Sequence, residues 1–493
     1  MKQGKALNVR MELFERLAAQ GAMIERLSSD SRRCAPGVAF FAYPGEKADG
    51  RAHIADAVAR GAAAVVWEKG GGFSWRADWR VPNEPVHDLK QHAGELADVF
   101  YGRPSQSLWM CGVTGTNGKT SCSQWIAALL SQCGAKTGVI GTLGSGYPGA
   151  LSGGANTTPD ALELHALLKN FVAQGARGVA MEVSSHGLVQ GRVNAVRFAC
   201  ALFTNLSHDH LDYHGSMEAY GTAKAQLFEV PGLKTAVLNL DDEMGVRLIH
   251  LARGRGLRTI GYTAGYTAGL APRAAVDEFI AMNGNTIESS WGHAPAAINQ
   301  VGSFNVSNVL GVLGCAIAYG VPFRDAVDRV GCLPSVPGRM QQVGERPLVV
   351  IDYAHTPDAL EKVLAALRPV ADARGGRLVA VFGAGGDRDP AKRPLMGAIA
   401  ARLADRTLVT SDNPRSEDPE AIIGAICAGM GGDCDTEPDR RRAIELAIAG
   451  AAPEDVVLVA GKGHEDYQEV AGKRLPFSDA GVARAALDAR SAR

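Results

Sequence analysis

Residues 112–121 constrain the fold of this chain more than any other segment. They read GVTGTNGKTS, begin in the last two residues of an apolar stretch at 108–113 and precede an amphipathic helical pattern around Trp125. A strand, a glycine-rich turn and a helix in this order form a phosphate-binding loop, in which backbone N–H groups and the helix N-terminus face phosphate oxygens. Lys119 would reach the outer phosphates, and Thr120 could bind magnesium. We therefore predict a mostly parallel α/β sheet that binds a nucleotide at this loop.

The loop departs from the strict consensus at one position. The consensus has a glycine five positions before Gly118, and the residue there is Val113. We expect Gly112 and Gly115 to supply the flexibility of the turn instead. A chance glycine-rich turn is the alternative, and the surrounding strand and helix disfavour it.

Strand and helix patterns alternate along the chain and predict three domains. At about 150 residues per domain, a chain of 493 residues suggests the same number. Turn-rich stretches at 101–105 and 333–338 mark the boundaries. We expect an α/β protein with a small N-terminal α/β domain at 1–105, a central P-loop NTPase-like domain with a mostly parallel sheet at 106–335, and a Rossmann-like doubly wound domain at 336–493.

Four predicted strands of the last domain each run into a polar cluster. The strands lie at 348–352, 378–382, 407–411 and 455–460, and the clusters read DYAHTPD, FGAGGDRD, SDNPRSEDP and AGKGHEDY. Ligands of open α/β sheets bind beyond the carboxyl ends of the strands. We therefore expect the four clusters to form one shared site.

Charge and composition exclude several classes of protein. Lys and Arg number 51 and Asp and Glu 52, so no nucleic-acid partner is predicted. The apolar runs are shorter than the roughly 20 residues of a membrane helix, so no membrane insertion is expected. The first ten residues lack the apolar core of a signal peptide, which indicates a cytoplasmic protein. The nine cysteines form no CxxC pair, and we expect reduced thiols.

Carboxylates and imidazoles are concentrated after two predicted strands of the central domain. Glu182 lies on one strand, and the next runs into TNLSHDHLDYHG at 204–215. An oxygen ligand such as Glu182 with one imidazole suits magnesium or manganese beside a nucleotide. We expect His210 to be that imidazole, whereas His208 and His214 are expected to cap helices or to form surface hydrogen bonds.

Two further features have no function by composition alone. Lys224, in the helical pattern AYGTAKAQLFEV, is interpreted as a solvated helix lysine. Residues 261–269 repeat Gly-Tyr-Thr-Ala, and we expect a solvated loop or hairpin because nothing else in the chain shares this period.

Nine motifs in order make the chain resemble the Mur ligase family. They read GVTGTNGKTS, EVSSH, FTNLSHDHLDYHG, GSFNVSN, PGRM, DYAHTPDAL, FGAGGDRD, DNPR and GKGHE. The resemblance extends over residues 30–465 and is closest to the members that add diaminopimelate. It implies an ATP-dependent ligase that joins meso-2,6-diaminopimelate to the D-glutamate of UDP-N-acetylmuramoyl-L-alanyl-D-glutamate, through an acyl phosphate, in peptidoglycan precursor synthesis.

The resemblance also assigns the ATP and magnesium site. Lys119 would neutralise charge on the transferred group, and Glu182, His210 and Thr120 would be magnesium ligands. Lys224 matches the carbamoylated lysine of the family, whose carbamate helps to hold a second magnesium, and this replaces its interpretation as a solvated lysine. The ATP-binding residues implied are Thr114, Gly115, Thr116, Asn117, Gly118, Lys119, Thr120, Asn308 (adenine), Arg339 and Asp352 (phosphates and ribose).

Two more sets of residues follow from the resemblance. The nucleotide-sugar peptide would be bound by Ser31, Asn156, Thr157, Thr158, Ser184, Gln190 and Arg192. Residues 46–48 are Glu-Lys-Ala where relatives often have His-Gln-Ala. The amino acid would be bound by Arg388, Asp412, Asn413, Pro414, Arg415, Gly461 and Glu465.

Selection of diaminopimelate over lysine requires a cation, because only diaminopimelate carries a second carboxylate. Arg415 in the DNPR motif supplies it, and the lysine-adding members of the family lack arginine there. A surface ion pair is the alternative role for Arg415.

We expect a monomer, and the resemblance implies that its domains close about hinges near residues 103 and 337. The alternatives are a lysine-adding Mur ligase, a ligase similar to folylpolyglutamate synthetase, a P-loop NTPase that acts as a switch, and a noncatalytic nucleotide-sugar-binding protein. The DNPR motif disfavours the first of these, and the N-terminal domain with its Asp-Ser-Arg motif disfavours the second.

Overall fold

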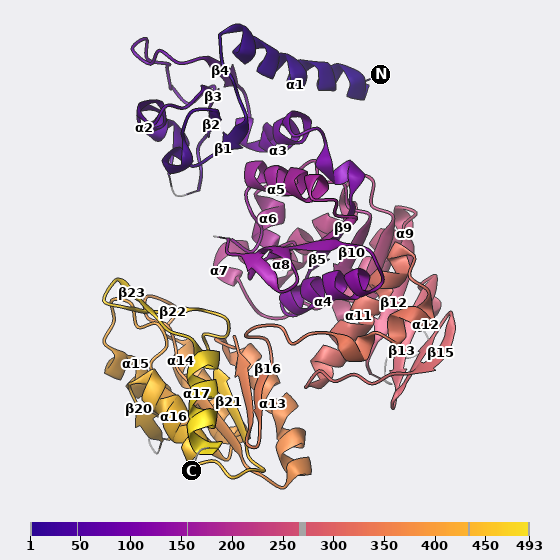
Figure 1. Ribbon diagram of the computed structural model, residues 1–493, viewed down its shortest axis with the longest axis vertical. Helices are drawn as coiled ribbons and strands as arrows, with labels where there is room; N and C mark the ends of the chain where they lie inside the picture. The colour runs from indigo at the N-terminus through magenta and orange to yellow at the C-terminus, as the bar shows by residue number, and fades with distance from the viewer. Residues whose placement is uncertain (1, 47, 155, 266–272, 432–433, 492–493) are drawn as a thin grey trace. The chain divides into compact units, whose positions relative to one another are not determined.

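The chain folds into two compact units in which helices cover mostly parallel sheets (Figure 1). The computed structural model describes residues 2–46, 48–154, 156–265, 273–431 and 434–491. The first unit comprises residues 1–296 and 310–330, and the second comprises residues 297–309 and 331–493. The predicted α/β class is confirmed. Among the described helices, none combines the length and the apolar character that a membrane crossing requires.

A four-stranded parallel sheet forms the N-terminal part of the first unit. Its strands are β1 (Arg26–Ser28), β2 (Val38–Ala42), β3 (Ala64–Glu68) and β4 (Asn83–Val86), and its helices are α1 (Lys2–Ala19), α2 (Ile54–Ala59) and α3 (Leu89–Phe100). Because successive side chains of a strand point to opposite faces, Phe40 and Phe41 on β2 belong to two different hydrophobic cores. The sheet is therefore buried on both faces.

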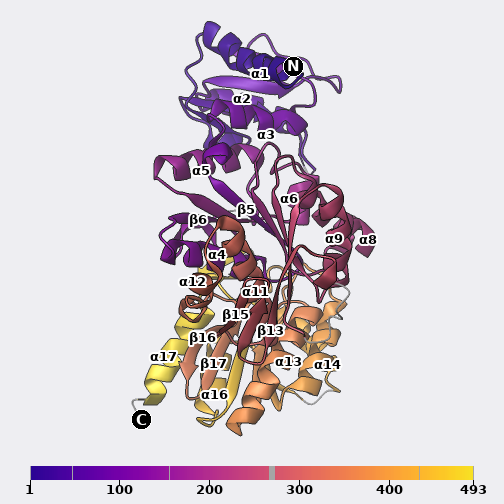
Figure 2. The ribbon, with the colours of Figure 1, turned by 90° about the vertical axis from the view of Figure 1, so that its right-hand side faces the viewer.

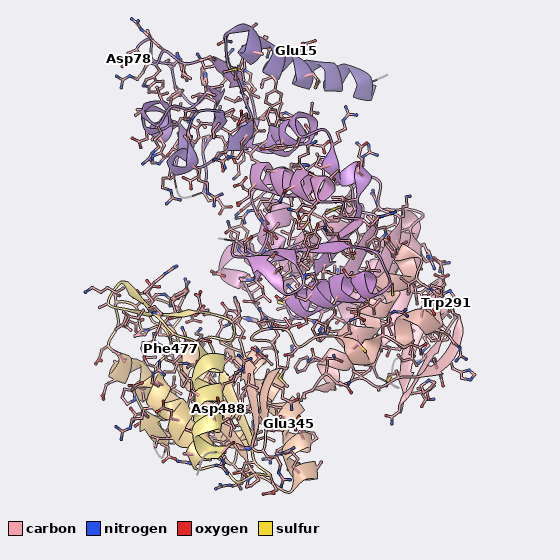
Figure 3. The ribbon with its side chains drawn as sticks, in the orientation of Figure 1. Glu15, Asp78, Trp291, Glu345, Phe477 and Asp488 are labelled. Carbon is pink, nitrogen blue, oxygen red and sulfur yellow. A yellow bond between two sulfur atoms is a disulfide. The ribbon has the colours of Figure 1, made fainter. Side chains whose placement is uncertain are left out.

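The larger sheet of the first unit has eleven strands, and the run from β13 to β6 is parallel. Figure 3 labels Trp291, in the turn between the last two strands at one edge. In order across the sheet the strands are β15 (Gly292–Pro295), β14 (Thr286–Ser289), β13 (Glu278–Asn283), β12 (Arg258–Thr263), β11 (Thr235–Asn239), β10 (Cys200–Phe203), β5 (Trp109–Thr114), β9 (Gly178–Glu182), β6 (Thr137–Gly141), β7 (Gly144–Tyr147) and β8 (Ala150–Ser152).

The strand order places the predicted site residues together. β5 lies between β9 and β10, so the phosphate loop, Glu182 and residues 204–215 all leave the same end of the sheet. The helices of this part are α4 (Lys119–Gln132), α5 (Ala161–Ala173), α6 (Ser185–Val189), α7 (Leu211–His214), α8 (Met217–Ala225), α9 (Glu243–Gly254), α12 (Phe323–Val327) and α11 (Ser303–Tyr319), which begins in the second unit.

The second unit is a six-stranded sheet with helices on both faces, as Figure 2 shows. In order the strands are β16 (Gln341–Glu345), β17 (Leu348–Asp352), β21 (Val456–Ala460), β18 (Leu378–Phe382), β19 (Arg406–Thr410) and β20 (Asp435–Glu437). β16 is antiparallel to β17, and the other pairings are parallel. One face packs against α13 (Pro357–Arg374), α14 (Lys392–Leu403) and α15 (Pro419–Ala428), the other against α16 (Arg440–Ala449) and α17 (Asp479–Ser491), and a hairpin pairs β22 (Tyr467–Val470) with β23 (Lys473–Pro476).

A fully buried ion pair fixes two strand ends of this sheet. The Arg440 guanidinium donates to both carboxylate oxygens of Asp479 at 2.8 and 2.7 Å. It also donates to the carbonyl of Ser411 at 3.3 Å and to that of Ala460 at 2.9 Å. α16 and α17 are thereby tied to the ends of β19 and β21, where two of the predicted site clusters begin.

Two expectations from the sequence are wrong. Cys427 and Cys434 form a disulfide, because the chain returns after α15 and brings their Cα atoms to 6.1 Å, which is within disulfide range. The other seven cysteines are thiols. Gly261 lies in the buried strand β12, where a Cβ would be 2.8 Å from Leu240, so residues 261–263 are not a solvated loop. Residues 266–269 lie outside the described part of the chain.

Candidate active site

The loop after β5 has the geometry of a phosphate-binding turn. Gly115 has a φ of +147°, and a Cβ there would lie 1.9 Å from Thr204 Oγ1. Gly118 has a φ of +87° and precedes α4. Thr204 Oγ1 donates to the Asn117 carbonyl at 2.6 Å, and the Asn117 N–H donates to Asn205 Oδ1 at 3.0 Å. The chain after β10 thus holds the loop open toward the N-terminus of α4.

The departure from the consensus has a structural reason. Val113 is buried inside β5 and pairs with Leu202 of β10, so the turn begins only at Gly115. Gly112 also lies in the strand, where a Cβ would be 3.0 Å from the Phe198 ring. Gly112 therefore permits close packing, and the expectation that it makes the turn flexible is wrong.

Two lysines converge on one carbonyl of this loop. Lys119 Nζ donates to the carbonyls of Gly115 and Thr116, both at 2.8 Å, and Lys224 Nζ donates to that of Gly115 at 2.9 Å. Lys224 is only 1% exposed and lies 4.2 Å from the ring centroid of Tyr220. Burial, with a contribution from Lys119, holds the pKa of Lys224 well below its usual value. The interpretation of Lys224 as a solvated lysine is wrong.

Glu182 lies beside the start of α4 and is held by three hydrogen bonds. Thr120 Oγ1 donates to Oε2 at 2.9 Å, the Thr142 N–H donates to Oε1 at 2.8 Å, and Thr142 Oγ1 donates to Oε2 at 3.1 Å. A Cβ at Gly141 would lie 2.1 Å from Oε1, so glycine leaves room for the carboxylate. Magnesium prefers such oxygen donors, and Thr120 with Glu182 fits that ion next to a phosphate loop.

His210 lies at the start of α7, in the left-handed region with a φ of 53°. Its side chain is 47% exposed, with Nε2 3.4 Å from Asp209 Oδ2 and the ring 6.1 Å from that of Tyr220. Partial burial lowers the pKa of His210, which favours the neutral imidazole that binds metals. His214 Nε2 is 2.9 Å from Ser185 Oγ. Because Ser185 is buried on α6, this bond is neither the helix cap nor the surface hydrogen bond expected for His214.

Four of the residues assigned to the nucleotide-sugar peptide form one network. Thr158 Oγ1 donates to the Glu182 carbonyl at 2.9 Å and to Ser184 Oγ at 3.1 Å. Arg192 donates to the Thr158 carbonyl and to Gln190 Oε1, both at 2.8 Å. The network therefore joins the proposed sugar-peptide residues to the strand that carries Glu182.

Two other residues of this set approach it from different elements. Thr157 Oγ1 lies 3.0 Å from Thr142 Oγ1, next to the Glu182 carboxylate. Ser31 is buried after β1, and its neighbour Ser29 donates to Asp160 Oδ2 at 3.3 Å. Ser31 is thereby placed near the start of α5.

Glu46, in the segment whose sequence differs from that of related ligases, also contacts residues assigned to the nucleotide-sugar peptide. Glu46 Oε1 accepts hydrogen bonds from Gln190 Nε2 and Tyr213 Oη, both at 2.8 Å. The Tyr213 bond, more than that of Gln190, lowers the pKa of the Glu46 carboxyl. Lys47 lies outside the described residues, and Asn156 is exposed.

In the second unit, two of the residues assigned to ATP, Arg339 and Asp352, lie at the end of β17. The Arg339 guanidinium is 4.7 Å from the ring centroid of Tyr353. The buried Asp352 carboxylate accepts the Met340 N–H at 2.7 Å. Burial raises the pKa of Asp352, while Arg339 acts in the opposite direction. Asn308 is buried on α11.

The four polar clusters of this unit meet, as predicted. Asn413 Nδ2 donates to Glu465 Oε2 at 2.8 Å, and the Gly386 N–H donates to the Asn413 carbonyl at 2.9 Å. The Gly461 N–H donates to the Asp352 carbonyl at 3.1 Å. These bonds link the loops that follow β17, β18, β19 and β21.

Arg415 lies between two of these loops. Its Nη1 donates to the Gly386 carbonyl at 2.7 Å, and its Nε is 3.7 Å from Glu469 Oε2 on β22, near the end of the hairpin drawn in yellow in Figure 1. The side chain is 21% exposed, so the ion pair with Glu469 is not a purely surface pair. Asp412 is buried nearby, whereas Arg388 is exposed.

Comparison with known proteins identifies the family to which this chain belongs. Three family models match successive stretches: "Mur ligase family, catalytic domain" at 23–101, "Mur ligase middle domain" at 113–316 and "Mur ligase, glutamate ligase domain" at 338–463. The chain belongs to the Mur ligase family. As a Mur ligase, it is an ATP-dependent ligase with the three-domain architecture of the family.

Two relatives that match this Mur ligase over nearly their whole length are named UDP-N-acetylmuramoyl-L-alanyl-D-glutamate--2,6-diaminopimelate ligase. The protein of Janthinobacterium sp. (strain Marseille) is 51% identical over 97% of each chain, and that of Chromobacterium violaceum is 50% identical over 95% of each chain. A solved structure of a ligase of this name is 37% identical, with a TM-score of 0.66 over 95% of each chain.

Thr142 and Tyr220 lie in the candidate site and were not predicted from the sequence. Thr142 follows β6, so the rule that ligands bind beyond carboxyl ends of strands could have found it. Tyr220 accepts a hydrogen bond from Thr116 Oγ1 at 3.3 Å and lies under Lys224. No sequence signal separates Tyr220 from other helix tyrosines, because its role depends on how α8 packs against the loop.

Proposed function

We propose that this Mur ligase joins meso-2,6-diaminopimelate to a D-glutamate carboxylate of UDP-N-acetylmuramoyl-L-alanyl-D-glutamate, using ATP. One observation carries the proposal: about half of all residues, over nearly the full chain, are identical to those of relatives named for this reaction. Arg415 among the four clusters supports diaminopimelate rather than lysine as the amino acid, because its guanidinium can pair with a second carboxylate.

The chemistry needs no protein nucleophile. A carboxylate is a poor electrophile, so an oxygen of the D-glutamate carboxylate takes the γ-phosphoryl group of ATP, which gives an acyl phosphate and ADP. The amine nitrogen of diaminopimelate then attacks the acyl carbon, loses a proton and expels phosphate through a tetrahedral intermediate. Lys119, at the phosphate loop, would neutralise charge on the transferred group, and the loops would position both substrates.

Thr120, Glu182 and His210 would hold magnesium together with a carbamate on Lys224. Magnesium, when bound, neutralises negative charge on the phosphates. The low pKa of Lys224 supports the carbamate, because the neutral amine is the form that attacks CO2 and then loses a proton. The product is an anion, which suits a position beside Lys119.

The same proposal covers the remaining ligand contacts. Asn308, Arg339 and Asp352 would bind adenine, phosphate and ribose, and the network of Thr158, Ser184, Gln190 and Arg192 would bind the sugar peptide with Ser31, Asn156 and Thr157. The proposal places the domain boundaries near residues 105 and 335 and has the domains close about hinges near 103 and 337. It also has the protein act as a monomer in the cytoplasm, where ATP is available.

An isotope experiment tests the acyl phosphate. The substrate dipeptide is prepared with 18O in its D-glutamate carboxylates, and the released phosphate is analysed by mass spectrometry. We expect one labelled oxygen per phosphate, because the carboxylate oxygen stays on phosphorus when the amide forms. Unlabelled phosphate would contradict the proposal and would favour a P-loop NTPase, in which water attacks ATP.

Replacement of Arg415 tests the selection of the amino acid. We expect Arg415→Ala to raise the KM for diaminopimelate about 10-fold to 100-fold, as for loss of a charged hydrogen bond. The kcat should change less, because the carboxylate pairs equally well in the ground and transition states. Steady-state phosphate release measures both constants. Arg402→Ala, which removes an exposed ion pair of α14 with Glu361, is the control, and an unchanged KM in Arg415→Ala would refute the role.

A further inference from the structure

A completely buried lysine lies beneath the proposed amino-acid site. Lys462 follows β21, and its side chain is 0% exposed. Its Nζ donates to Asn413 Oδ1 at 2.8 Å and to Glu465 Oε2 at 3.0 Å, and lies 3.6 Å from Asp412 Oδ1. A buried ammonium is costly unless it is paired and hydrogen-bonded. All three partners belong to the residues assigned to the amino acid. The charge of Lys462 is therefore balanced by side chains of the proposed amino-acid site.

Lys462 and the backbone N–H of Glu469 together determine which way the Asn413 amide points. Asn413 Oδ1 accepts from Lys462 Nζ and from the backbone N–H of Glu469, at 2.8 and 2.9 Å. Both partners can only donate, so a flipped amide would place its NH2 group against two donors. The amide nitrogen must therefore face Glu465, to which it donates at 2.8 Å.

The same bonds determine which atoms remain for a ligand. Glu465 Oε2 accepts from both Asn413 Nδ2 and Lys462 Nζ. Within the described part of the chain, no side chain or backbone group hydrogen-bonds to Glu465 Oε1, and Asn413 Nδ2 uses one of its two hydrogens. One carboxylate oxygen of Glu465 and one amide N–H of Asn413 thus remain for a ligand. The oxygen can accept a hydrogen bond from an ammonium and the N–H can donate one to a carboxylate, the two charged groups of an amino acid.

We propose that Lys462 is a positioning residue for the amino-acid substrate: it orients Asn413 and Glu465 so that Glu465 Oε1 and one Asn413 N–H face diaminopimelate. This inference rests on the proposed function. Lys462 itself does not touch the substrate, since its side chain is 0% exposed and two of its three N–H donors bind Asn413 and Glu465. The loss of Lys462 should therefore weaken amino-acid binding, whereas ATP binding should be unaffected.

The test compares Lys462→Met with a control at the opposite end of the same sheet. Arg377, just before β18, forms an ion pair at 3.0 Å with Asp455, just before β21, and Arg377→Met removes it. Full-length variants are assayed by phosphate release, and their thermal unfolding is recorded. We expect Lys462→Met to raise the KM for diaminopimelate about 10-fold with little change in the KM for ATP. Arg377→Met should leave both constants unchanged.

Other outcomes overturn the proposal. A folded Lys462→Met variant with an unchanged KM for diaminopimelate, or with equal increases for diaminopimelate and ATP, excludes a positioning role. Should this variant not fold, Lys462→Gln keeps an N–H donor without the charge and should show a smaller rise in the same KM. If neither variant folds, Lys462 serves stability alone and the proposal is rejected. Wild-type protein that does not use diaminopimelate would instead refute the proposed function.

Discussion

Replacement of Lys119 by alanine is expected to lower kcat about 1,000-fold, the effect of losing a principal charge-stabilising group in phosphoryl or acyl transfer. Lys119 Nζ lies at the phosphate loop, bonded to the Gly115 and Thr116 carbonyls at 2.8 Å. ATP would compete for this ammonium, which then neutralises the γ-phosphoryl group during transfer. Phosphate release at saturating substrates measures the effect.

An exposed lysine provides the control for Lys119. Lys234 lies at the surface just before β11, and Lys234→Ala should retain wild-type turnover. Both variants should unfold at temperatures close to that of the wild type, because the hydrogen bonds from Lys119 to the Gly115 and Thr116 carbonyls lie within its own loop. A Lys119→Ala variant with kcat within about twofold of wild type would show that the loop does not act on the transferred group.

Replacement of Lys224 by alanine is expected to lower kcat about 100-fold or more, as for a lost ligand or supporting group of a metal site. A short carboxylic acid such as acetate should restore part of the activity, since it can occupy the space of the missing carbamate. The buried position of Lys224, 1% exposed and next to Gly115, provides that space.

The two lysines are controls for each other. Acetate should not rescue Lys119→Ala, because a carboxylate cannot replace a cation. Near-normal turnover of Lys224→Ala, or equal rescue of both variants by acetate, would exclude the carbamate. Removal of CO2 from the buffer should lower the activity of the wild type and leave Lys224→Ala unaffected.

The sequence predicts the second unit well. The strands expected at 348–352 and 378–382 coincide with β17 and β18, because each is a short apolar run bounded by polar residues. The right-handed alternation of strands and helices then brings their carboxyl ends together. For the same reason the polar clusters meet as expected, and hydrogen bonds join Asn413, Glu465 and Gly386.

Features that depend on tertiary packing could not be predicted from the residues alone. Lys224 has the sequence context of a surface lysine, and it is buried only because α8 packs against the phosphate loop. Gly112 resembles a loop glycine, yet it serves packing against Phe198. The Cys427–Cys434 disulfide depends on the path of the chain after α15 rather than on a spacing motif. For Lys224 and Gly112 the decisive neighbours are distant in the sequence. For the two cysteines the neighbour is near in the sequence, but no motif marks the fold of the chain that brings them together.

The most direct test of the account is phosphate release from ATP in the presence of UDP-N-acetylmuramoyl-L-alanyl-D-glutamate and either meso-diaminopimelate or L-lysine. We expect release to require both the nucleotide substrate and an amino acid, and to be much faster with diaminopimelate than with lysine. Release from ATP alone, or equal rates with the two amino acids, would contradict the account.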